Sequence, residues 1–570
     1  MALFGKNGFD SPMLSFVRQL FLTLQILPLA VAVLSTPVFA LESEIEREWQ
    51  QREKTDFENQ QKRLENATPP KQLPAPVQLT LPPVEEICFE ITEIKSSNTT
   101  FPWVIELGKP YLNQCIGRQG IALYLRAINK ELLARGYATS RAALPQQDLS
   151  SGVLELVVQT GTLEEIEFPE SYRPIWRHAL PMTPGAALNI RDLEQGLDQY
   201  NRLPSQNVDL KILPGSKPGQ SKIIANVNES KKWSIGLSLD DSGSESTGVH
   251  QFAMNASSYN LFMVQDLVTV TKSGDADDDH DAGNNSASLS IEVPFGYWSW
   301  NINAIESDST QLVKGDVQNF ISSTTSKDIS SKLSHVVFRD NASKASWYFQ
   351  VKKRKRRNYI NDTVVEVQSR DLSNIELGVN HRYFFGRSVV DSTFSIHQGV
   401  DWFNAEKKDA SAASNVAQPD YRFYSLSSSL NAPFSLFEKP ISFSSQFRFQ
   451  QAETALYSLD WFSNGGRYTV RGFAPSESLG AADGWRFRND LNLPMQTMPI
   501  TAYVGWDFGR VTGQGAKGLS DRTLMGIALG VKWQKFGAKI ESFIAQPIMY
   551  TGPSAKSECC EISTSLSWQY

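Results

Sequence analysis

The long C-terminal part of the chain, residues 231–570, alternates apolar and polar side chains at every second position. Successive side chains of a strand point to opposite faces, so this period predicts strands. The clearest segments are Trp233–Leu239, Ile441–Gln450 and Met525–Trp533. A soluble β-sandwich also alternates, but a globular core would not carry Ser, Gln, Arg and Lys on one face and aromatic rings on the other. The pattern predicts a transmembrane antiparallel β-barrel with an apolar outside and a polar lumen.

The length of this region sets the size of the barrel. It holds about 340 residues, and at about 20 residues for each strand and its connection this is enough for about 16 strands. The last segment is the most regular, with Ile562, Thr564, Leu566, Trp568 and Tyr570 on one face. The chain therefore ends on a strand with an aromatic residue.

Residues 1–40 have the features of a secretory signal peptide. An apolar run from Leu20 to Leu34 follows basic residues and precedes a small-residue site that ends at Ala40. A membrane anchor is the alternative, but a spanning helix needs about 20 apolar residues, and Arg18 and Gln25 interrupt any longer window. We therefore expect export from the cytoplasm and cleavage after Ala40.

Two polar segments follow the signal peptide. Residues 41–66 are rich in charged helix formers and have too few apolar side chains to bury one face in a core, so they predict a helix in water. A frayed, solvated tail is the alternative. From Thr68 to Pro83 the chain has six prolines, which predicts an extended linker over residues 67–83.

Residues 84–160 and 161–230 show two similar α+β units. In the first, the segments CFEITEI, YATSRAAL and GVLELVVQTG predict strands, and IALYLRAINKELLARG predicts an amphipathic helix that ends at Gly136. In the second, TLEEIEF, VDLKILPG and SKIIANVNE predict strands around a helix capped by Asn189.

Four cysteines fit an oxidising compartment. Cys88 and Cys115 lie in the first α+β unit and are predicted to form a disulfide that closes it. Cys559 and Cys560 are neighbours in sequence, and a bridge between neighbours is strained and uncommon. We assign them no role.

Charge and motifs argue against several functions. The net charge of −6 gives no case for nucleic acid as a partner, and metal-ligand, GxSxG and phosphate-loop patterns are missing from the sequence. We therefore predict no catalytic residue, no metal and no cofactor. The acidic run 275–281 lacks the spacing of an EF-hand loop and predicts a solvated loop rather than a calcium site. The basic run 352–357 predicts either a solvated strand end, a lining of the lumen or a contact with lipid phosphates.

Two short segments near the C-terminus carry the functional hypothesis. The first is Val470-Arg471-Gly472-Phe473, and the second is Gly505-Trp506-Asp507-Phe508-Gly509. In the second, Asp507, Gly505 and Gly509 share the polar face, so Asp507 points into the lumen. A carboxylate there is unusual unless a cation is held against it, and Arg471 is the cation that we expect.

These segments resemble the signature of the TpsB family, the outer-membrane transporters of two-partner secretion. In that family a VRG[YF] tetrapeptide lies at the tip of a long loop folded back into the barrel, and its arginine pairs with an aspartate on the inner wall. The resemblance implies that Phe473 packs the loop tip and that the helix of residues 41–66 fills the lumen as a plug. It also identifies the two α+β units as POTRA domains, and Trp568 and Tyr570 as the signal read by the outer-membrane assembly machinery.

The resemblance further implies a function and a place in the cell. The chain would carry one large unfolded exoprotein, recognised through its N-terminal two-partner secretion domain, across the outer membrane of a Gram-negative bacterium without ATP. The POTRA domains would lie in the periplasm, where chaperones are further candidate partners, and the barrel would contact outer-membrane lipids. Alternatives are a factor that inserts other barrels, a solute-diffusion porin, and POTRA domains that act only as rigid spacers.

Overall fold

The computed structural model describes residues 38–65, 67, 69, 73–74, 81–170, 172, 175, 178–244, 248–277, 282–314, 318–413, 415–519, 522–549 and 560–570. Residues 40–570 form one compact unit. The predicted signal peptide lies outside the described residues except for its last three, and most of the proline-rich linker lies outside them as well. None of the described helices is long and apolar enough to cross a membrane.

The C-terminal region is a closed antiparallel barrel of 16 strands; the alternation predicted the barrel, and the length of the region indicated the number of strands. Each strand pairs with the next, and the last strand closes the barrel against the first. A two-residue strand, β16 (Thr363–Val364), only extends the hairpin after β15. The barrel strands are β9 (Trp233–Asp240), β10 (Gln251–Tyr259), β11 (Leu267–Asp275), β12 (Gly283–Phe295), β13 (Trp298–Lys314), β14 (Asn319–Arg339), β15 (Ser343–Ile360), β17 (Arg370–Phe385), β18 (Ser388–Val400), β19 (Arg422–Leu436), β20 (Lys439–Ala452), β23 (Asp483–Pro494), β24 (Ile500–Thr512), β25 (Thr523–Lys535), β26 (Ala538–Met549) and β27 (Glu561–Gln569).

Burial along β24 follows the predicted alternation. Val504 and Trp506 are each 40% exposed, whereas Tyr503 and Asp507 are 3% and 1% exposed. The exposed apolar side chains form the face that meets lipid, and the buried polar ones face the interior. Asp507 therefore faces the interior of the barrel.

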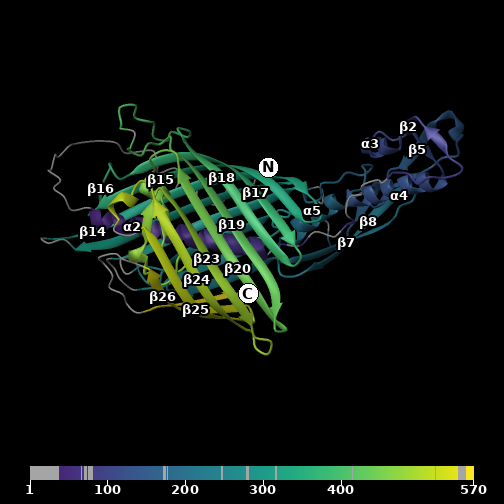
Figure 1. The fold of residues 1–570 in the computed structure, drawn as a ribbon. Helices are drawn as coiled ribbons and strands as arrows, with labels where there is room; N and C mark the ends of the chain where they lie inside the picture. The colour runs from purple at the N-terminus through teal and green to yellow at the C-terminus, as the bar shows by residue number, and fades with distance from the viewer. Residues whose placement is uncertain are drawn as a thin grey trace, which may run out of the picture. The chain divides into compact units, whose positions relative to one another are not determined.

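The helix α2 (Val38–Glu65) lies inside the barrel (Figure 1). It begins three residues before the predicted start. Its side chains bond to inward-facing residues of strands from several sides of the barrel: Asp240 of β9, Arg356 of β15, Asp391 of β18, Arg448 of β20 and Arg486 of β23. A helix with few apolar residues is stable there because the polar lumen supplies partners for its charges.

The first α+β unit packs two small sheets against helices around one apolar core. Its elements are β1 (Phe89–Ile91), β2 (Glu93–Ser96), α3 (Trp103–Leu107), β3 (Gln114–Ile116), α4 (Arg118–Ala134), β4 (Arg141–Ala143) and β5 (Val153–Gln159). The prediction of one strand over CFEITEI was wrong, because β1 pairs with β3 and β2 pairs with β5. Ile91 and Ile94 are both buried, and since they are three residues apart, a single alternating strand would place them on opposite faces.

The second α+β unit has one sheet in the order β6-β8-β7 and one helix. Its elements are β6 (Thr162–Glu167), α5 (Ile190–Asn201), β7 (Gln206–Pro214) and β8 (Gln220–Glu229). The predicted cap is present, since the Asn189 side chain accepts a hydrogen bond from the Arg191 N–H. Helix α5 contacts the end of β14 and the turn between β12 and β13: Arg339 pairs with Glu194 and Asp198, and Gln195 donates to the Gly296 carbonyl.

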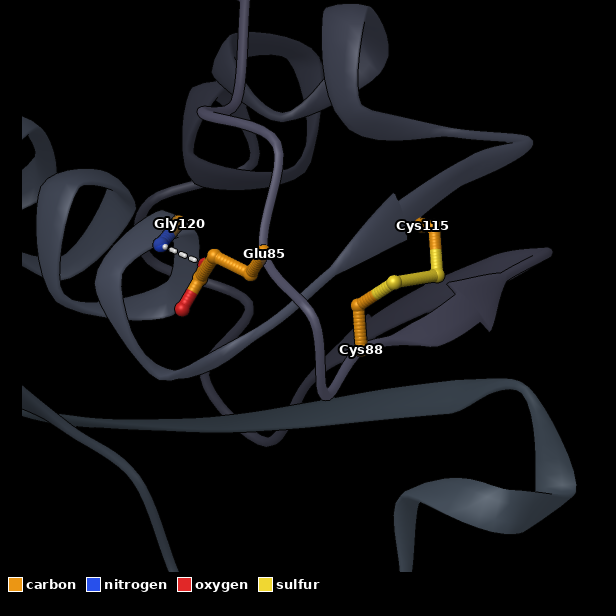
Figure 2. The surroundings of a disulfide bond; sticks show 4 residues. All are labelled: Glu85, Cys88, Cys115 and Gly120. Carbon is orange, nitrogen blue, oxygen red and sulfur yellow. Dashed lines mark hydrogen bonds between the residues drawn. A yellow bond between two sulfur atoms is a disulfide. The ribbon is translucent and has the colours of Figure 1, made fainter.

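Cys88, which directly precedes β1, and Cys115 of β3 form a disulfide in the first unit (Figure 2). Close to it, the Glu85 carboxylate accepts hydrogen bonds from the N–H groups of Gln119 and Gly120 in the first turn of α4. These N–H donors, Gln119 first, lower the pKa of the Glu85 carboxyl below its usual value. The segment before β1 is thus fixed to the unit by one covalent bond and one charged cap.

Replacing both Cys88 and Cys115 by serine is expected to lower the free energy of unfolding of the first unit by about 3 kcal/mol. The bridge spans a sequence separation of 27 residues, so its loss returns considerable entropy to the unfolded chain. Limited proteolysis of the purified full chain checks this, with faster cleavage expected within residues 84–160. Cleavage within residues 161–230 is the internal control, and equal rates for both proteins in the first unit would contradict the prediction.

Candidate functional site

The loop between β20 and β23 folds inward against the barrel wall. It contains a short hairpin of β21 (Phe462–Asn464) and β22 (Leu479–Ala481). Val470 and Phe473 are 0% and 1% exposed, and they pack with apolar side chains that include Val511 and Leu524 near the ends of β24 and β25. The loop tip is therefore buried, with Phe473 inside this apolar cluster.

Arg471 and Asp507 are in direct contact. Arg471 Nε donates to Asp507 Oδ2 at 2.6 Å, and Nη2 donates to Oδ1 at 2.8 Å. The Arg471 backbone N–H also donates to Oδ2. The guanidinium is 0% exposed, so this is a bidentate, fully desolvated pair with additional hydrogen bonds.

A second carboxylate, which the sequence analysis missed, completes this contact. Asp490 of β23 lies directly opposite Gly505 of β24, and its Oδ1 lies 2.8 Å from Arg471 Nη2. The available signal was the alternation of Arg486, Arg488 and Asp490 on one strand face, which places all three toward the lumen.

Glycines make the space that the arginine occupies. A Cβ atom added at Gly505 would lie 2.3 Å from Arg471 Nη2, and one added at Gly526 would lie 1.9 Å from the Arg471 carbonyl oxygen. Gly526 is paired with Asp507 across β24 and β25, and sequence reasoning missed it. A Cβ at Gly509 would instead meet the Asn464 side chain of the loop at 2.7 Å. The wall opposite the loop is recessed because these positions lack side chains.

Gly472 has a conformational reason of its own. Its φ of +92° lies in the region that favours glycine, and an added Cβ would lie 2.7 Å from the Gln546 backbone. Its N–H donates to Glu561 of the last strand at 3.0 Å. The tetrapeptide therefore contacts β24 through Arg471 and β27 through Gly472.

Helix α2 binds the same loop. Trp49 donates from Nε1 to the Ser458 carbonyl, and Gln50 donates from Nε2 to the Gly465 carbonyl, both at 2.9 Å. Arg52 donates to the Leu459 and Trp461 carbonyls. These contacts tie the helix to the loop that carries Arg471.

Among the α2 side chains whose burial the structure describes, residues 45–65, Glu53 is the most buried charged one, at 1% exposed. Arg448 Nη1 of β20 donates to its carboxylate at 3.0 Å, and Arg486 of β23 donates to the same oxygen. Ser463 of the loop donates to its other oxygen at 3.3 Å. One carboxylate thus joins the helix, two strands and the loop.

The basic run 352–357 lies within β15 rather than at a solvated strand end. Arg356 is 2% exposed and donates to Glu48 of α2 at 2.6 Å, and Arg354 pairs with Asp328 of β14. The solvated interpretation is wrong for these two residues, because alternate side chains of the strand point into the lumen. The lumen-lining alternative is the one observed for them.

The remaining predicted residues lie elsewhere. Trp568 and Tyr570 stack on each other at the end of the last strand, and Lys231 lies over the Tyr570 ring. Cys560 is half-buried, whereas Cys559 and residues 278–281 of the acidic run lie outside the described residues. Within the described residues, no group of three His, Cys, Asp or Glu side chains is arranged to hold a metal ion.

Comparison with known protein families shows to which family the chain belongs. The family model described as haemolysin secretion/activation protein ShlB/FhaC/HecB matches residues 219–533, more than half of the chain. The chain belongs to this family. A ShlB-type POTRA domain matches residues 89–161, and a second POTRA domain matches residues 162–214. This is the TpsB family that the VRGF segment indicated, and its members are transporters rather than enzymes.

Individual relatives agree with this assignment. The chain is 32% identical to the outer membrane transporter CdiB-2 of Burkholderia pseudomallei over 74% of its own length and 72% of the relative. It is 27% identical to the hemolysin transporter protein HpmB of Proteus mirabilis, with 76% and 77% covered. The solved structure of CdiB from Escherichia coli is similar with a TM-score of 0.83 and 25% identity, covering 95% of this chain and all of that one. The TpsB barrel lies in the outer membrane with its POTRA domains in the periplasm, and TpsB transporters act with secreted exoprotein partners.

Proposed function

We propose that this TpsB transporter carries one large, unfolded exoprotein of the haemolysin, adhesin or contact-dependent toxin type to the cell surface without nucleotide hydrolysis. The observation that carries the proposal is the buried Arg471–Asp507 pair, on a loop that also holds the lumen helix. In this state α2 and the loop occupy the lumen, and a polypeptide passes only after α2 leaves.

Recognition of the exoprotein begins at the POTRA domains in this proposal. A groove of about 680 Å³ opens on the first one, lined by Ile87, Phe89, Ile116 and Leu144. Ile87 is 81% exposed, so part of the apolar lining of the groove faces solvent. Such a groove suits the N-terminal secretion domain of the partner, and it favours a binding role over that of a rigid spacer.

Movement through the barrel follows from the same arrangement. The periplasm has no ATP, so the free energy comes from folding of the exoprotein outside the cell, which makes return unfavourable. Arg471 and Asp507 set the position of the loop that shapes the channel. Trp568 and Tyr570 at the end of β27 are the segment read by the assembly machinery, outer-membrane lipids surround the apolar face, and periplasmic chaperones keep the exoprotein unfolded.

The test is secretion of an N-terminal fragment of a candidate exoprotein. Cells that make this protein are expected to release the fragment into the medium, and cells without it are expected to retain the fragment. Folded barrel in the outer membrane, measured by its heat-dependent electrophoretic mobility, is the control. A folded barrel that releases none of a panel of fragments from haemolysin, adhesin and toxin partners would contradict the proposal. A large steady ion conductance unchanged by deletion of residues 41–66 would favour the porin instead.

A further inference from the structure

Two arginines of the barrel wall face each other across adjacent strands. Arg448 of β20 and Arg486 of β23 are directly opposed in the register of the two strands, and both point into the lumen. Like charges at opposed positions of a sheet repel each other. An arrangement of this kind is stable when an anion lies between the two guanidinium groups.

While α2 lies in the lumen, an arrangement that we call the closed state, the helix supplies that anion. The Glu53 carboxylate receives hydrogen bonds from both arginines, and Asp56, one turn further along the helix, pairs with Arg448. Glu48 contacts Arg356 of β15 in the same lumen. From Leu41 to Asn66 the chain has eight acidic and five basic side chains, so α2 is a net-acidic polypeptide bound to a cationic part of the wall.

Departure of α2 removes the carboxylates from this site. Within the described residues, the ion-pair partners of Arg448 are Glu53 and Asp56, and that of Arg486 is Glu53. Arg486 keeps a hydrogen bond to the Ser463 carbonyl, which carries no charge. Two opposed guanidinium groups then line a wet channel with no carboxylate between them.

We propose that Arg448 and Arg486, which together we term the arginine pair, bind acidic segments of the exported polypeptide in place of α2. This inference rests on the proposed function and names a chemical preference of the channel. Guanidinium groups recognise carboxylates by paired hydrogen bonds in a fixed geometry. Once water fills the lumen such contacts are weak, so they hold an acidic segment briefly and let it move on.

The experiment uses the full chain in planar bilayers and a probe that does not require the natural partner. The variant Glu53→Gln/Asp56→Asn removes the two carboxylates of α2 that contact the arginine pair and leaves the arginine pair in place, and it is expected to open the channel. Soluble poly-glutamate is expected to block this open channel, and poly-lysine of the same length is not. Adding Arg448→Gln/Arg486→Gln is expected to raise the half-blocking concentration of poly-glutamate by about tenfold or more.

A matched control removes the same charge elsewhere in the lumen. Lys332→Gln/Lys352→Gln in the same open background is expected to change the half-blocking concentration of poly-glutamate by less than about twofold. These lysines contact the Tyr348 ring and Asp328 rather than the arginine pair. Equal weakening by both double substitutions would overturn the proposal, since general charge would then explain the block. An open channel that poly-glutamate does not block, or a background that stays closed, would also overturn it. The proposed transport function is tested separately, by measuring secretion of the exoprotein fragment.

Discussion

Arg471→Ala is expected to abolish secretion of the exoprotein fragment while the barrel still assembles in the outer membrane. The substitution leaves the buried Asp507 carboxylate without its bidentate partner, and breaking such a pair costs about 3–5 kcal/mol. Asp490, on the neighbouring strand, loses the same guanidinium. The loop is then expected to leave the recess formed by Gly505 and Gly526, whereas the strand pairing of the barrel does not depend on Arg471. Fragment in the medium measures the first effect, and heat-dependent mobility of the barrel measures the second.

A matched arginine on the surface gives the control for this prediction. Arg422 pairs with Glu453 at 3.5 Å, but both side chains are about half exposed, so Arg422→Ala is expected to change secretion little. Arg471→Lys is expected to recover only part of the activity, because an ammonium cannot make the two parallel hydrogen bonds to Asp507. Normal secretion by Arg471→Ala would show that the pair does not position the loop.

The sequence predicted the barrel and the orientation of Asp507 because both follow from a local rule. In a strand that separates lipid from water, neighbouring side chains face the lipid and the lumen in turn, and the four residues from Val504 to Asp507 follow this alternation. The same rule, applied to β23, would also have pointed to Asp490. It does not reach Gly526, since its position opposite Asp507 depends on how β24 and β25 are paired.

The contacts of α2 could not be predicted in the same way. Gln50 and the Gly465 carbonyl are 415 positions apart in the sequence, and they meet only after the barrel has closed. The sequence predicted a helix that is polar on nearly all sides, and a helix of this kind is expected to be surrounded by water. It gave no sign that Glu53 would be buried, because burial of a carboxylate depends on arginines supplied by two distant strands.

Glu53→Lys is expected to produce a channel that is open most of the time. Residue 53 is 1% exposed and lies next to Arg448 and Arg486, so a lysine there would be a buried cation among cations. A change of about 5 kcal/mol is enough to move a two-state population from about 1:99 to nearly the reverse. The helix is therefore expected to leave the lumen, which single-channel recording would register as a steady conductance.

Glu58 provides the matched control for this substitution, because it lies on the same helix but is exposed. Glu58→Lys makes the same change of charge without burying it, so the channel is expected to stay mostly closed, as in the unmodified protein. If both substitutions opened the channel equally, the result would indicate that the net charge of α2, rather than the buried contacts of Glu53, holds the helix in the lumen. If Glu53→Lys alone opens it, the buried contacts of a single carboxylate with Arg448, Arg486 and the loop keep the channel closed.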